Sequence, residues 1–416
     1  MENIKEYVLE LCKEVKTAQR ELASLNADKK NDALKKIASA LTENAEWIIE
    51  ENKKDIAASE GVIPKTMVDR LSLNADRIKA ISDSLIQVAS LPDPVGEGTV
   101  TVRPNGLKIT KTRVPIGVVG MIYEARPNVT VDAAALCIKS GNGAVLRGGK
   151  EAVNTNRALI KVMKKALEDS AVPSDVIALI DDVTREGTNT LMSMKGYVDV
   201  LIPRGGKGLI KAVVENATVP VIETGAGNCH IYIDEHADLT KSVGVAINAK
   251  LSRPSVCNAV ETMLVHRAVA KEFLPLFAER AKASSLEIRG CADTCKILSS
   301  AIPATEIDYE TEFDDYILAV KIVDSLDEAI EHIRRYTTGH SEAIMTESYA
   351  NATRFCRELD AAAVYVNAST RFTDGGEFGF GAEIGISTQK LHTRGPMGLA
   401  ELTTVKYIVE GDGQVR

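Results

Sequence analysis

Aromatic residues are scarce in this chain of 416 residues: they make up 4% of it, and only one is a tryptophan. Clusters of lysine and arginine interleaved with aromatic residues are also absent, and the formal net charge is -8. A nucleic-acid surface needs concentrated positive charge to contact the phosphates. The composition therefore argues against nucleic acid as a partner.

Long apolar runs are missing too. No stretch approaches the about 18 apolar residues that can span a bilayer, and residues 1–6 lack the basic-then-apolar order of a signal peptide. We therefore expect a cytoplasmic protein that does not associate with membranes. The seven cysteines are an odd number spread from Cys12 to Cys356, which favours reduced thiols. The close pair Cys291 and Cys295 has no second pair or histidine cluster nearby, so we expect no metal site.

The length and the 45% of hydrophobic residues allow two or three domains. Helical periodicity runs through residues 2–90 and breaks at a segment rich in proline and glycine, 91–98. A short polar hairpin follows at 99–113, with its turn near Asn105-Gly106. Such a hairpin is a candidate oligomerisation arm, and a strand expected at 402–409 could pair with it.

From residue 115 onward, apolar strands alternate with helices. Strands are predicted at 116–123, 144–147, 176–180, 198–202 and 220–223, and helices at 131–139, 156–168, 188–194 and 209–216. Repeated strand–helix–strand units of this length indicate a parallel, doubly wound sheet. A second alternating region after residue 234 includes strands at 259–265, 317–323 and 363–367 and helices at 238–250 and 326–336. The sequence thus predicts an α/β protein with two α/β domains.

The first strand–helix unit lacks the Gly-x-Gly-x-x-Gly loop of ordinary dinucleotide sites, because Glu124-Ala125-Arg126-Pro127-Asn128 follows the strand instead. Two other loops combine glycines with cations after a predicted strand: 147–150, Arg-Gly-Gly-Lys, and 204–207, with the same residues. The second precedes a helix whose N-terminus can hold a phosphate. Each loop alone could be a plain turn, but together they favour a phosphate-bearing ligand. The glycine run at 375–381 has no strand-to-helix context and is more typical of a mobile or tight loop.

Cys257 lies in a turn between two regular segments. Pro254 ends the preceding helix, and a strand begins near Ala259. A thiol at such a junction can face a cleft, and Arg253 nearby could favour the thiolate. The alternative is a buried small hydrophobe, which is the usual place of a reduced cysteine. His266 cannot pair with this thiol, because a strand between them would carry the imidazole far away.

Two further histidines, His230 and His340, could be structural residues or substrate contacts, and we favour a structural role for both.

Six motifs together resemble the gamma-glutamyl phosphate reductase family of the aldehyde dehydrogenase superfamily. They are found at residues 122–128, 146–150, 202–207, 248–259, 340–344 and 381–392. The resemblance covers essentially the whole chain. It implies a Rossmann-like cofactor domain in 1–97 and 114–229, a catalytic α/β domain in 230–385, and an oligomerisation arm in 98–113 and 386–416. A homo-oligomer is therefore expected.

The resemblance implies NADPH-dependent reduction of gamma-glutamyl phosphate to glutamate 5-semialdehyde, with release of phosphate, in proline biosynthesis. Cys257 would be the nucleophile that forms a thioester. Asn128 matches the superfamily's oxyanion-hole asparagine and would act with the backbone N–H of Cys257. No kinase-like domain precedes residue 1, so we expect a separate glutamate kinase to supply the acyl phosphate.

The expected cofactor contacts are Arg147, Lys150, Arg204, Gly205 and Gly206. Lys150 stands where relatives that prefer NAD carry a carboxylate, and a cation there suits the 2′-phosphate of NADP(H).

The substrate carries a carboxylate and a phosphate, so Arg253 and Arg371 are hypotheses for its anions, with surface arginines as the alternative. Glu223 opens the sequence Glu-Thr-Gly-Ala-Gly at 223–227, where oxidising relatives have Glu-Leu-Gly-Gly-Lys. A reductase has no need to activate water there, which leaves Glu223 a structural or proton-handling role. Two other functions remain open: an oxidising aldehyde dehydrogenase, and a non-enzymatic nucleotide-binding protein on the same fold.

Overall fold

The computed structural model describes residues 4–63, 65–124 and 126–416. The chain divides into two compact units. Unit 1 comprises Met1–Thr224, Gly379–Gly385 and Met397–Arg416, and unit 2 comprises Gly225–Phe378 and Ile386–Pro396. Each unit has its own sheet and its own core. The cofactor, catalytic and assembly roles expected for these parts of the chain stay predictions.

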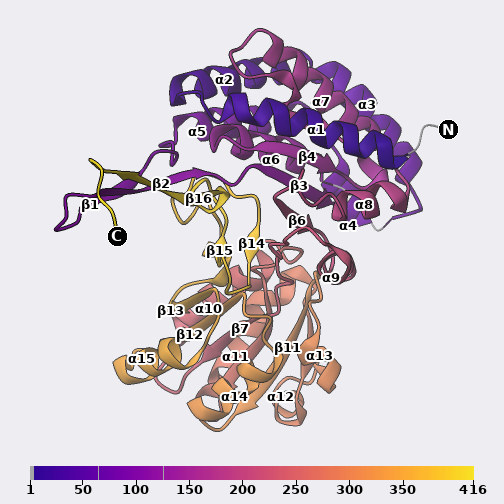
Figure 1. The fold of residues 1–416 in the computed structure, drawn as a ribbon. Helices are drawn as coiled ribbons and strands as arrows, with labels where there is room; N and C mark the ends of the chain where they lie inside the picture. The colour runs from indigo at the N-terminus through magenta and orange to yellow at the C-terminus, as the bar shows by residue number, and fades with distance from the viewer. Residues whose placement is uncertain (1–3, 64, 125) are drawn as a thin grey trace. The chain divides into compact units, whose positions relative to one another are not determined.

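Unit 1 combines helices with a parallel sheet and an antiparallel sheet (Figure 1). Its helices are α1 (Ile4–Leu22), α2 (Ala27–Glu43), α3 (Ala45–Ser59), α4 (Lys65–Leu71), α5 (Ala75–Ser90), α6 (Pro127–Lys139), α7 (Val153–Glu168), α8 (Arg185–Met192) and α9 (Lys207–Asn216). Its strands are β1 (Gly98–Val102), β2 (Lys108–Pro115), β3 (Val118–Tyr123), β4 (Gly143–Arg147), β5 (Ile177–Leu179), β6 (Val200–Arg204) and β16 (Thr403–Glu410).

The parallel sheet of unit 1 has the order β5-β4-β3-β6 and is covered on both faces. Side chains of a strand alternate between faces, and β3 illustrates this. Val119 and Met121 pack with α2, α5, α6 and α7, whereas Val118 and Ile122 pack with α1, α8 and α9. The predicted doubly wound parallel sheet is confirmed.

One predicted strand of this sheet, 220–223, is wrong in extent. Only an isolated bridge between Leu201 and Val221 forms there. It rests on hydrogen bonds from the Leu201 N–H to the Pro220 carbonyl, 2.8 Å, and from the Ile222 N–H to the Leu201 carbonyl, 2.9 Å. The next hydrogen bond to β6 comes from a side chain and not from the backbone, since the Thr224 hydroxyl donates to the Pro203 carbonyl at 2.6 Å. The backbone ladder therefore does not continue beyond the bridge.

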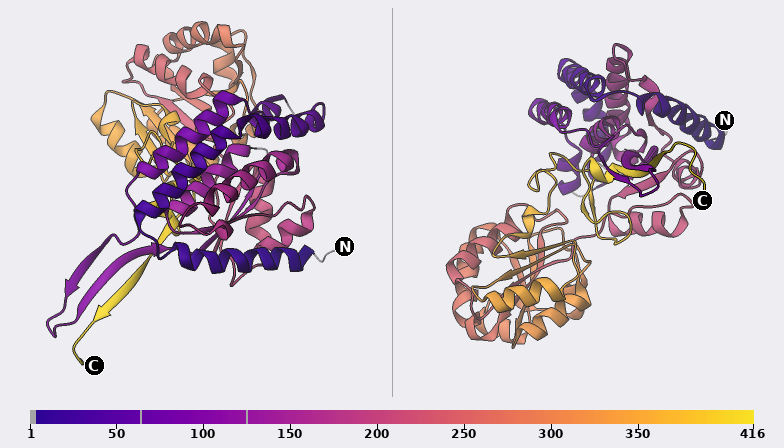
Figure 2. Two further views of the ribbon diagram at one scale, coloured as in Figure 1. Left: turned by 90° about the horizontal axis from the view of Figure 1, so that it is seen from above. Right: turned by 60° about the vertical axis from the view of Figure 1, so that its left-hand side comes forward.

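Strands β1, β2 and β16 form an antiparallel sheet in that order. The left view of Figure 2 shows them extending away from the helices of unit 1. The expected pairing of the last strand with the hairpin is therefore confirmed. Apolar side chains such as Val102 and Tyr407 are exposed on the strands. A role of this sheet in assembly stays a prediction.

Unit 2 contains a seven-stranded sheet in which every pair is parallel, in the order β10-β9-β11-β8-β7-β12-β13. The strands are β7 (Cys229–Ile233), β8 (Val260–His266), β9 (Glu287–Gly290), β10 (Ile302–Pro303), β11 (Ile317–Val323), β12 (Ser341–Met345) and β13 (Ala363–Val366), with a separate hairpin of β14 (Ile386–Ser387) and β15 (Gly395–Pro396). The helices are α10 (Leu239–Leu251), α11 (Arg267–Ala281), α12 (Ala292–Ile297), α13 (Glu306–Glu310), α14 (Leu326–Tyr336) and α15 (Tyr349–Glu358).

The two faces of this sheet are also covered by different helices. Ile231 and Val265 pack with α10 and α11, whereas Tyr232 and Leu264 pack with α14 and α15. The second α/β domain predicted from the sequence is thus present. No helix of the described residues is long and apolar enough to cross a membrane.

The segment from Ser252 to Ala259, which we name the Cys257 turn, joins α10 to β8 as predicted. It precedes β8 and therefore lies at the amino-terminal edge of the sheet. Because the strands are parallel, the first residues of β7 and β12 belong to the same edge. The nucleophile candidate is therefore close to residues that are distant in the sequence.

Candidate active site

The side chain of Cys257 is half-buried, and none of the seven cysteines, all of which are described, forms a disulfide. Gly227 packs directly against the backbone of the Cys257 turn. A Cβ atom added to Gly227 would lie 2.5 Å from the Cα atom of Cys257 and closer still to its carbonyl oxygen. Only glycine allows this approach. The Gly227 N–H also donates to Oε1 of Glu312 at 2.8 Å.

Asn258, the residue after Cys257, anchors the turn to the loop at 370–373. Its side-chain amide donates to the carbonyl oxygens of Arg371, at 3.2 Å, and Thr373, at 3.0 Å. Its own carbonyl accepts the hydroxyl of Thr370 at 2.6 Å. The guanidinium of Arg371 donates to Oδ1 of Asn258 and to Oγ of Ser252, the latter at 3.1 Å. The turn is thus fixed on both sides of Cys257.

Arg253 and Arg371 interact electrostatically with each other, and Arg371 also interacts with Cys257. Burial and then the charge of Arg253 lower the pKa of Arg371, whereas Cys257 raises it. Arg253 is exposed. Two guanidinium groups in this neighbourhood attract anions. The structure therefore brings three predicted site residues together in unit 2.

A buried pair of a lysine and a glutamate joins the two regular segments that flank the Cys257 turn. Nζ of Lys250, at the end of α10, lies 2.5 Å from Oε2 of Glu261 in β8, and their side chains are 0% and 1% exposed. The strand pairing shifts at this point, because Cys229 faces Val260 but His230 faces Thr262. Glu261 is thus the extra residue of a bulge, a feature that often occurs beside active sites.

The remaining predicted site residues lie in unit 1. Strands β3 and β6 are neighbours, with β4 and β5 beyond β3 on the other side. The chain order reverses between β3 and β6, and ligands of such sheets bind beyond the carboxyl ends of the strands at this point. Strand β3 ends at Tyr123 and β6 at Arg204, which is half-buried. The sequence-predicted loop 204–207 therefore begins at the expected edge.

Gly205 and Gly206 are exposed and directly precede α9. The N–H of Gly206 donates to a carboxylate oxygen of Glu124 at 3.0 Å. A Cβ atom at Gly205 would lie 2.6 Å from the carboxyl carbon of Glu124. An anionic group is thus seated at the N-terminus of α9, where phosphates bind in nucleotide sites. Glu124 was missed by sequence reasoning, because its contact comes from a loop 82 residues away.

Asn128, in the first turn of α6, is exposed. Its Nδ2 atom donates to Oδ2 of Asp132, one turn further along the helix, at 3.0 Å. Burial raises the pKa of Asp132 to about 6, although hydrogen bonds from Asn128 and Ser84 and the charge of Arg204 lower it. Asp132 therefore orients the amide expected to serve as an oxyanion donor. The sequence contained a signal for this pair, since residues four apart share a helix face.

The loop from Arg147 to Lys150 follows β4 and leads into a short 3-10 helix. The guanidinium of Arg147 is buried and donates to the carbonyl oxygens of Gly148 and Thr184, the latter at 3.1 Å. Arg147 thus ties this loop to the start of α8. Lys150 is exposed.

Three other residues singled out from the sequence are placed as follows. Glu223 is half-buried near the end of the first segment of unit 1. His230 and His340 are both 0% exposed in unit 2. Nδ1 of His230 lies 3.1 Å from Oε2 of Glu342, which suits the structural role favoured from the sequence.

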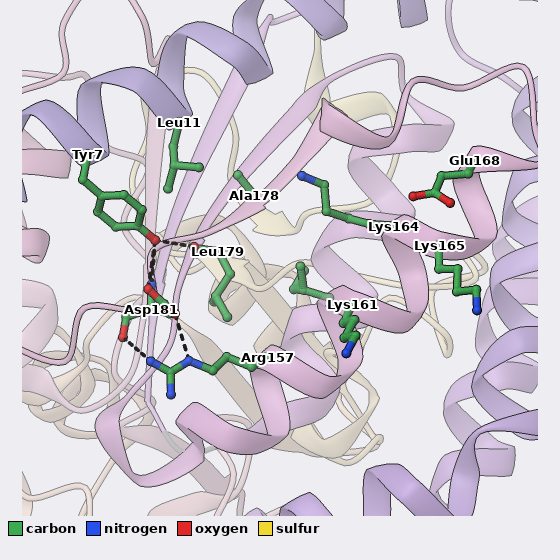
Figure 3. Close-up of a pocket in the computed structure, with 11 residues that line it drawn as sticks. Tyr7, Leu11, Arg157, Lys161, Lys164, Lys165, Glu168, Ala178, Leu179 and Asp181 are labelled. Carbon is green, nitrogen blue, oxygen red and sulfur yellow. Dashed lines mark hydrogen bonds and ion pairs between the residues drawn. The ribbon is translucent and has the colours of Figure 1, made fainter.

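A pocket of about 490 Å³ in unit 1 lies between α1, α7 and β5 (Figure 3). Lys161, Lys164 and Lys165 of α7 border it. The Tyr7 hydroxyl and Nε of Arg157 each lie 2.9 Å from the Asp181 carboxylate, which ties α1 and α7 to the end of β5. None of the predicted site residues lines this pocket.

Among the described residues, no group of three or more histidine, cysteine, aspartate or glutamate side chains is placed to hold a metal ion.

The aldehyde dehydrogenase family model matches residues 3–294 and 311–408. The gamma-glutamyl phosphate reductase of Carboxydothermus hydrogenoformans is 59% identical over 98% of this chain and 99% of its own length. That of Clostridium acetobutylicum is 56% identical over 100% of both chains.

A crystal structure of gamma-glutamyl phosphate reductase from Thermotoga maritima matches with a TM-score of 0.95 and 51% identity, covering 98% of this chain and 99% of that one. This match confirms the predicted fold class. The chain therefore belongs to the aldehyde dehydrogenase family and, within it, to the family of gamma-glutamyl phosphate reductases.

Proposed function

We propose that this chain reduces gamma-glutamyl phosphate to glutamate 5-semialdehyde and releases phosphate, using NADPH, as a step of proline biosynthesis. The proposal rests on the Cys257 turn, which holds a thiol in a fixed position in a chain that belongs to the gamma-glutamyl phosphate reductase family. Gly227 and Asn258 fix the backbone of this turn, and the charge of Arg371, which interacts with Arg253, acts on the thiol. A held thiol in a cationic setting suits attack on an anionic acyl phosphate.

In the proposed reaction, the Cys257 thiolate attacks the acyl carbon, and the bond from that carbon to the phosphate oxygen breaks. The products of this step are a thioester on Cys257 and free phosphate. When bound, NADPH supplies the hydride that reduces the thioester. The Asn128 amide and the backbone N–H of Cys257 stabilise the negative charge on the substrate oxygen. Breakage of the carbon–sulfur bond then releases the aldehyde and restores the thiolate.

The residues of unit 1 fit a phosphate-bearing cofactor. The Gly206 N–H already donates a hydrogen bond to the carboxylate of Glu124, so the N-terminus of α9 can hold an anion. We propose Gly205, Gly206 and Arg204 as pyrophosphate contacts and the exposed Lys150 as the residue that selects NADP(H) over NAD(H).

The selectivity of Lys150 is tested by kinetics. Lys150→Glu should lower kcat/KM for NADPH by about 10-fold or more, because a lost charge-assisted hydrogen bond is worth about 1.5–3 kcal/mol. The kcat/KM for NADH should change little. An unaltered preference for NADPH would remove Lys150 from the proposal, and Lys161→Glu, on the surface of α7, is the matched charge control.

The substrate anions are assigned to two arginines. Arg253 is exposed and able to meet a ligand, whereas Arg371 already holds Asn258 and Ser252. We therefore propose that Arg253 binds a substrate anion and that Arg371 contributes its charge while holding the turn. Arg253→Ala should raise KM for the acyl phosphate with little change in kcat, and Arg371→Ala should lower kcat as well. Unchanged values for either variant would remove that residue.

The decisive experiment runs the reaction backwards. Glutamate 5-semialdehyde should reduce NADP only when inorganic phosphate is present, and Cys257→Ala should be inactive. Reduction that proceeds equally without phosphate would instead favour an oxidising aldehyde dehydrogenase. Nucleotide binding without turnover in the folded wild type would favour a non-enzymatic binding protein.

Four further proposals concern the assembly and location of the enzyme, the source of its substrate, and one residue. We propose that the sheet of β1, β2 and β16 joins subunits into a homo-oligomer, supported by its exposed apolar residues Val102 and Tyr407. Removing residues 403–416 should lower the number of subunits per particle, measured as the mass of the particle by analytical ultracentrifugation. We also propose a cytoplasmic location and a separate glutamate kinase as the supplier of the acyl phosphate. Glu223 is proposed as a structural or proton-handling residue.

A further inference from the structure

His340 and Ser341 have no part in the proposed reaction, yet both are fully buried at the start of β12. Nδ1 of His340 lies 2.8 Å from the Ser341 hydroxyl and 3.7 Å from the sulfur of Cys229. Cys229 is the first residue of β7 and is also 0% exposed. Its thiol donates to the carbonyl oxygen of Cys257 at 3.2 Å. A single side chain thus separates His340 from the backbone of the nucleophile candidate.

The polar contacts continue on the other side of His340. The Ser341 hydroxyl lies 2.6 Å from the hydroxyl of Thr373, which lies 2.7 Å from the hydroxyl of Tyr365. Burial raises the pKa of Tyr365 to about 12, so this hydroxyl keeps its proton at neutral pH. The contacts form one chain from Tyr365 of β13 to the carbonyl of Cys257. We name it the polar chain.

The polar chain contacts the Cys257 turn at two places. The first is the thiol of Cys229, which donates to the Cys257 carbonyl. The second is Thr373, whose backbone carbonyl accepts the side-chain amide of Asn258 at 3.0 Å. The turn is therefore held at two successive residues by groups that the polar chain connects.

Cys229 is itself held in place by a contact between the residue that follows it in β7, His230, and Glu342 of β12. Oε2 of Glu342 accepts the backbone N–H of His230 at 3.0 Å and lies 3.1 Å from Nδ1 of that ring. This clamp joins the first residues of β7 to those of β12. Burial raises the pKa of Cys229 well above that of an ordinary cysteine, so it stays a thiol and keeps its donor. Cys229 can therefore hold a carbonyl but does not compete with Cys257 as a nucleophile.

Four of the five side chains in the polar chain are buried, and Tyr365 is half-buried. Burying polar groups is costly, and apolar residues would fill the same space at lower cost. A buried hydrogen-bonded network does, however, impose one geometry on the groups that it touches. We propose that His340, acting through Cys229, is a positioning residue that fixes the Cys257 turn for attack. The proposal rests on the proposed function only in that Cys257 is the nucleophile.

The central test removes the thiol of Cys229. Cys229→Ala should lower kcat by about 10-fold, because small displacements of a reacting group have large effects on rate. The KM for NADPH should stay unchanged. The rate of alkylation of Cys257 by iodoacetamide, measured by mass spectrometry, should change by about threefold or more, since it reports the same geometry without substrate. Cys229→Ser keeps a donor and should recover most of both rates.

The matched control is Cys12→Ala, which removes another fully buried cysteine, from the apolar core around α1. It should lower the Tm to a similar degree while kcat and Cys257 alkylation stay at wild-type values. His340→Leu should reproduce Cys229→Ala, and His340→Asn, which keeps a polar atom near the position of Nδ1, should be milder. Because the two residues act in series, the double variant Cys229→Ala/His340→Leu should lose no more than the worse single variant.

The outcomes separate this role from the proposed function. If Cys257→Ala retains activity, the proposed function fails. If Cys257→Ala is inactive while Cys229→Ala and His340→Leu keep wild-type kcat and alkylation rates, only the positioning role fails. If Cys229→Ala does not fold, His340→Asn and His340→Leu decide the matter, and equal kcat values for these two would overturn the proposal.

Discussion

Replacing Gly227 by alanine is the change that most directly tests how the Cys257 turn is held. The added Cβ atom would lie 2.5 Å from the Cα atom of Cys257, and the atoms in the way belong to the backbone. No side-chain rotation can relieve the overlap. Ordinary contact begins at 3.4 Å. The carbonyl oxygen of Cys257 lies even closer to the added Cβ atom than its Cα atom does, so the two backbones must separate by more than about 1 Å.

A shift of this size falls on the nucleophile itself. Misplacing a reacting group by about 1 Å can cost roughly 100-fold in rate, which equals about 2.7 kcal/mol in the activation barrier. Overpacking a buried site also destabilises a fold by about 1–3 kcal/mol. We therefore expect Gly227→Ala to lower kcat by about 100-fold and to lower the Tm by a few degrees.

The assay should compare kcat, the KM for NADPH and the alkylation of Cys257 at a temperature well below the Tm of the variant. Gly244→Ala is the control, because it lies in α10 of the same unit and an added Cβ atom meets nothing within 4 Å. Alanine in a helix should stabilise that variant by about 0.5–1 kcal/mol and leave kcat unchanged. If Gly227→Ala keeps kcat within about threefold of wild type, the Cys257 turn is not held by this contact.

Two further predictions concern buried charges. Lys250 lowers the pKa of Glu261, which burial raises to about 8. Lys250→Met should therefore destabilise more at pH 9, approaching about 3–5 kcal/mol, than at pH 6, where Glu261 is protonated in both proteins. Equal losses in urea unfolding at the two pH values would contradict this, and Lys250→Met/Glu261→Leu should recover stability at pH 9. The raised pKa of Asp132, about 6, means that ionisation costs stability as pH rises from about 4 to 6. At pH 8, Asp132→Asn should thus have a higher Tm and a free energy of unfolding up to about 3 kcal/mol above that of the wild type. At pH 4 the two proteins should be equally stable. A difference that does not depend on pH would refute the raised pKa of Asp132.

The regular elements of unit 2 were accessible from the sequence because their apolar periodicity is strong. The strand at 317–323 and the helix at 326–336 coincide with β11 and α14. The strand expected at 220–223 had the right composition, but whether a ladder forms depends on the neighbouring strand, which local pattern does not reveal. Element type was thus predictable where the pattern was long, whereas the missing ladder at 220–223 was not.

The position of Cys257 was predictable for a similar reason. Pro254 and the apolar run after Ala259 mark a helix-to-strand junction, and the structure has one there. The partners of the turn were not predictable, because they come from distant segments. Gly227 precedes Cys257 by 30 positions in the numbering, and Thr373 follows Asn258 by 115. No local signal distinguishes a glycine that admits a neighbouring backbone from one in an ordinary loop.

The motif His340-Ser341-Glu342 makes this limit concrete. As a sequence it carried only a resemblance, since an imidazole, a hydroxyl and a carboxylate in a row have no fixed chemistry. Its meaning comes from the register of β12 against β7, which places Glu342 beside His230 and so brings His340 to Cys229. A one-residue slip of β12 would turn these side chains to the opposite face of the sheet. The polar chain and the strand register therefore depend on each other, and disrupting either one should displace the Cys257 turn.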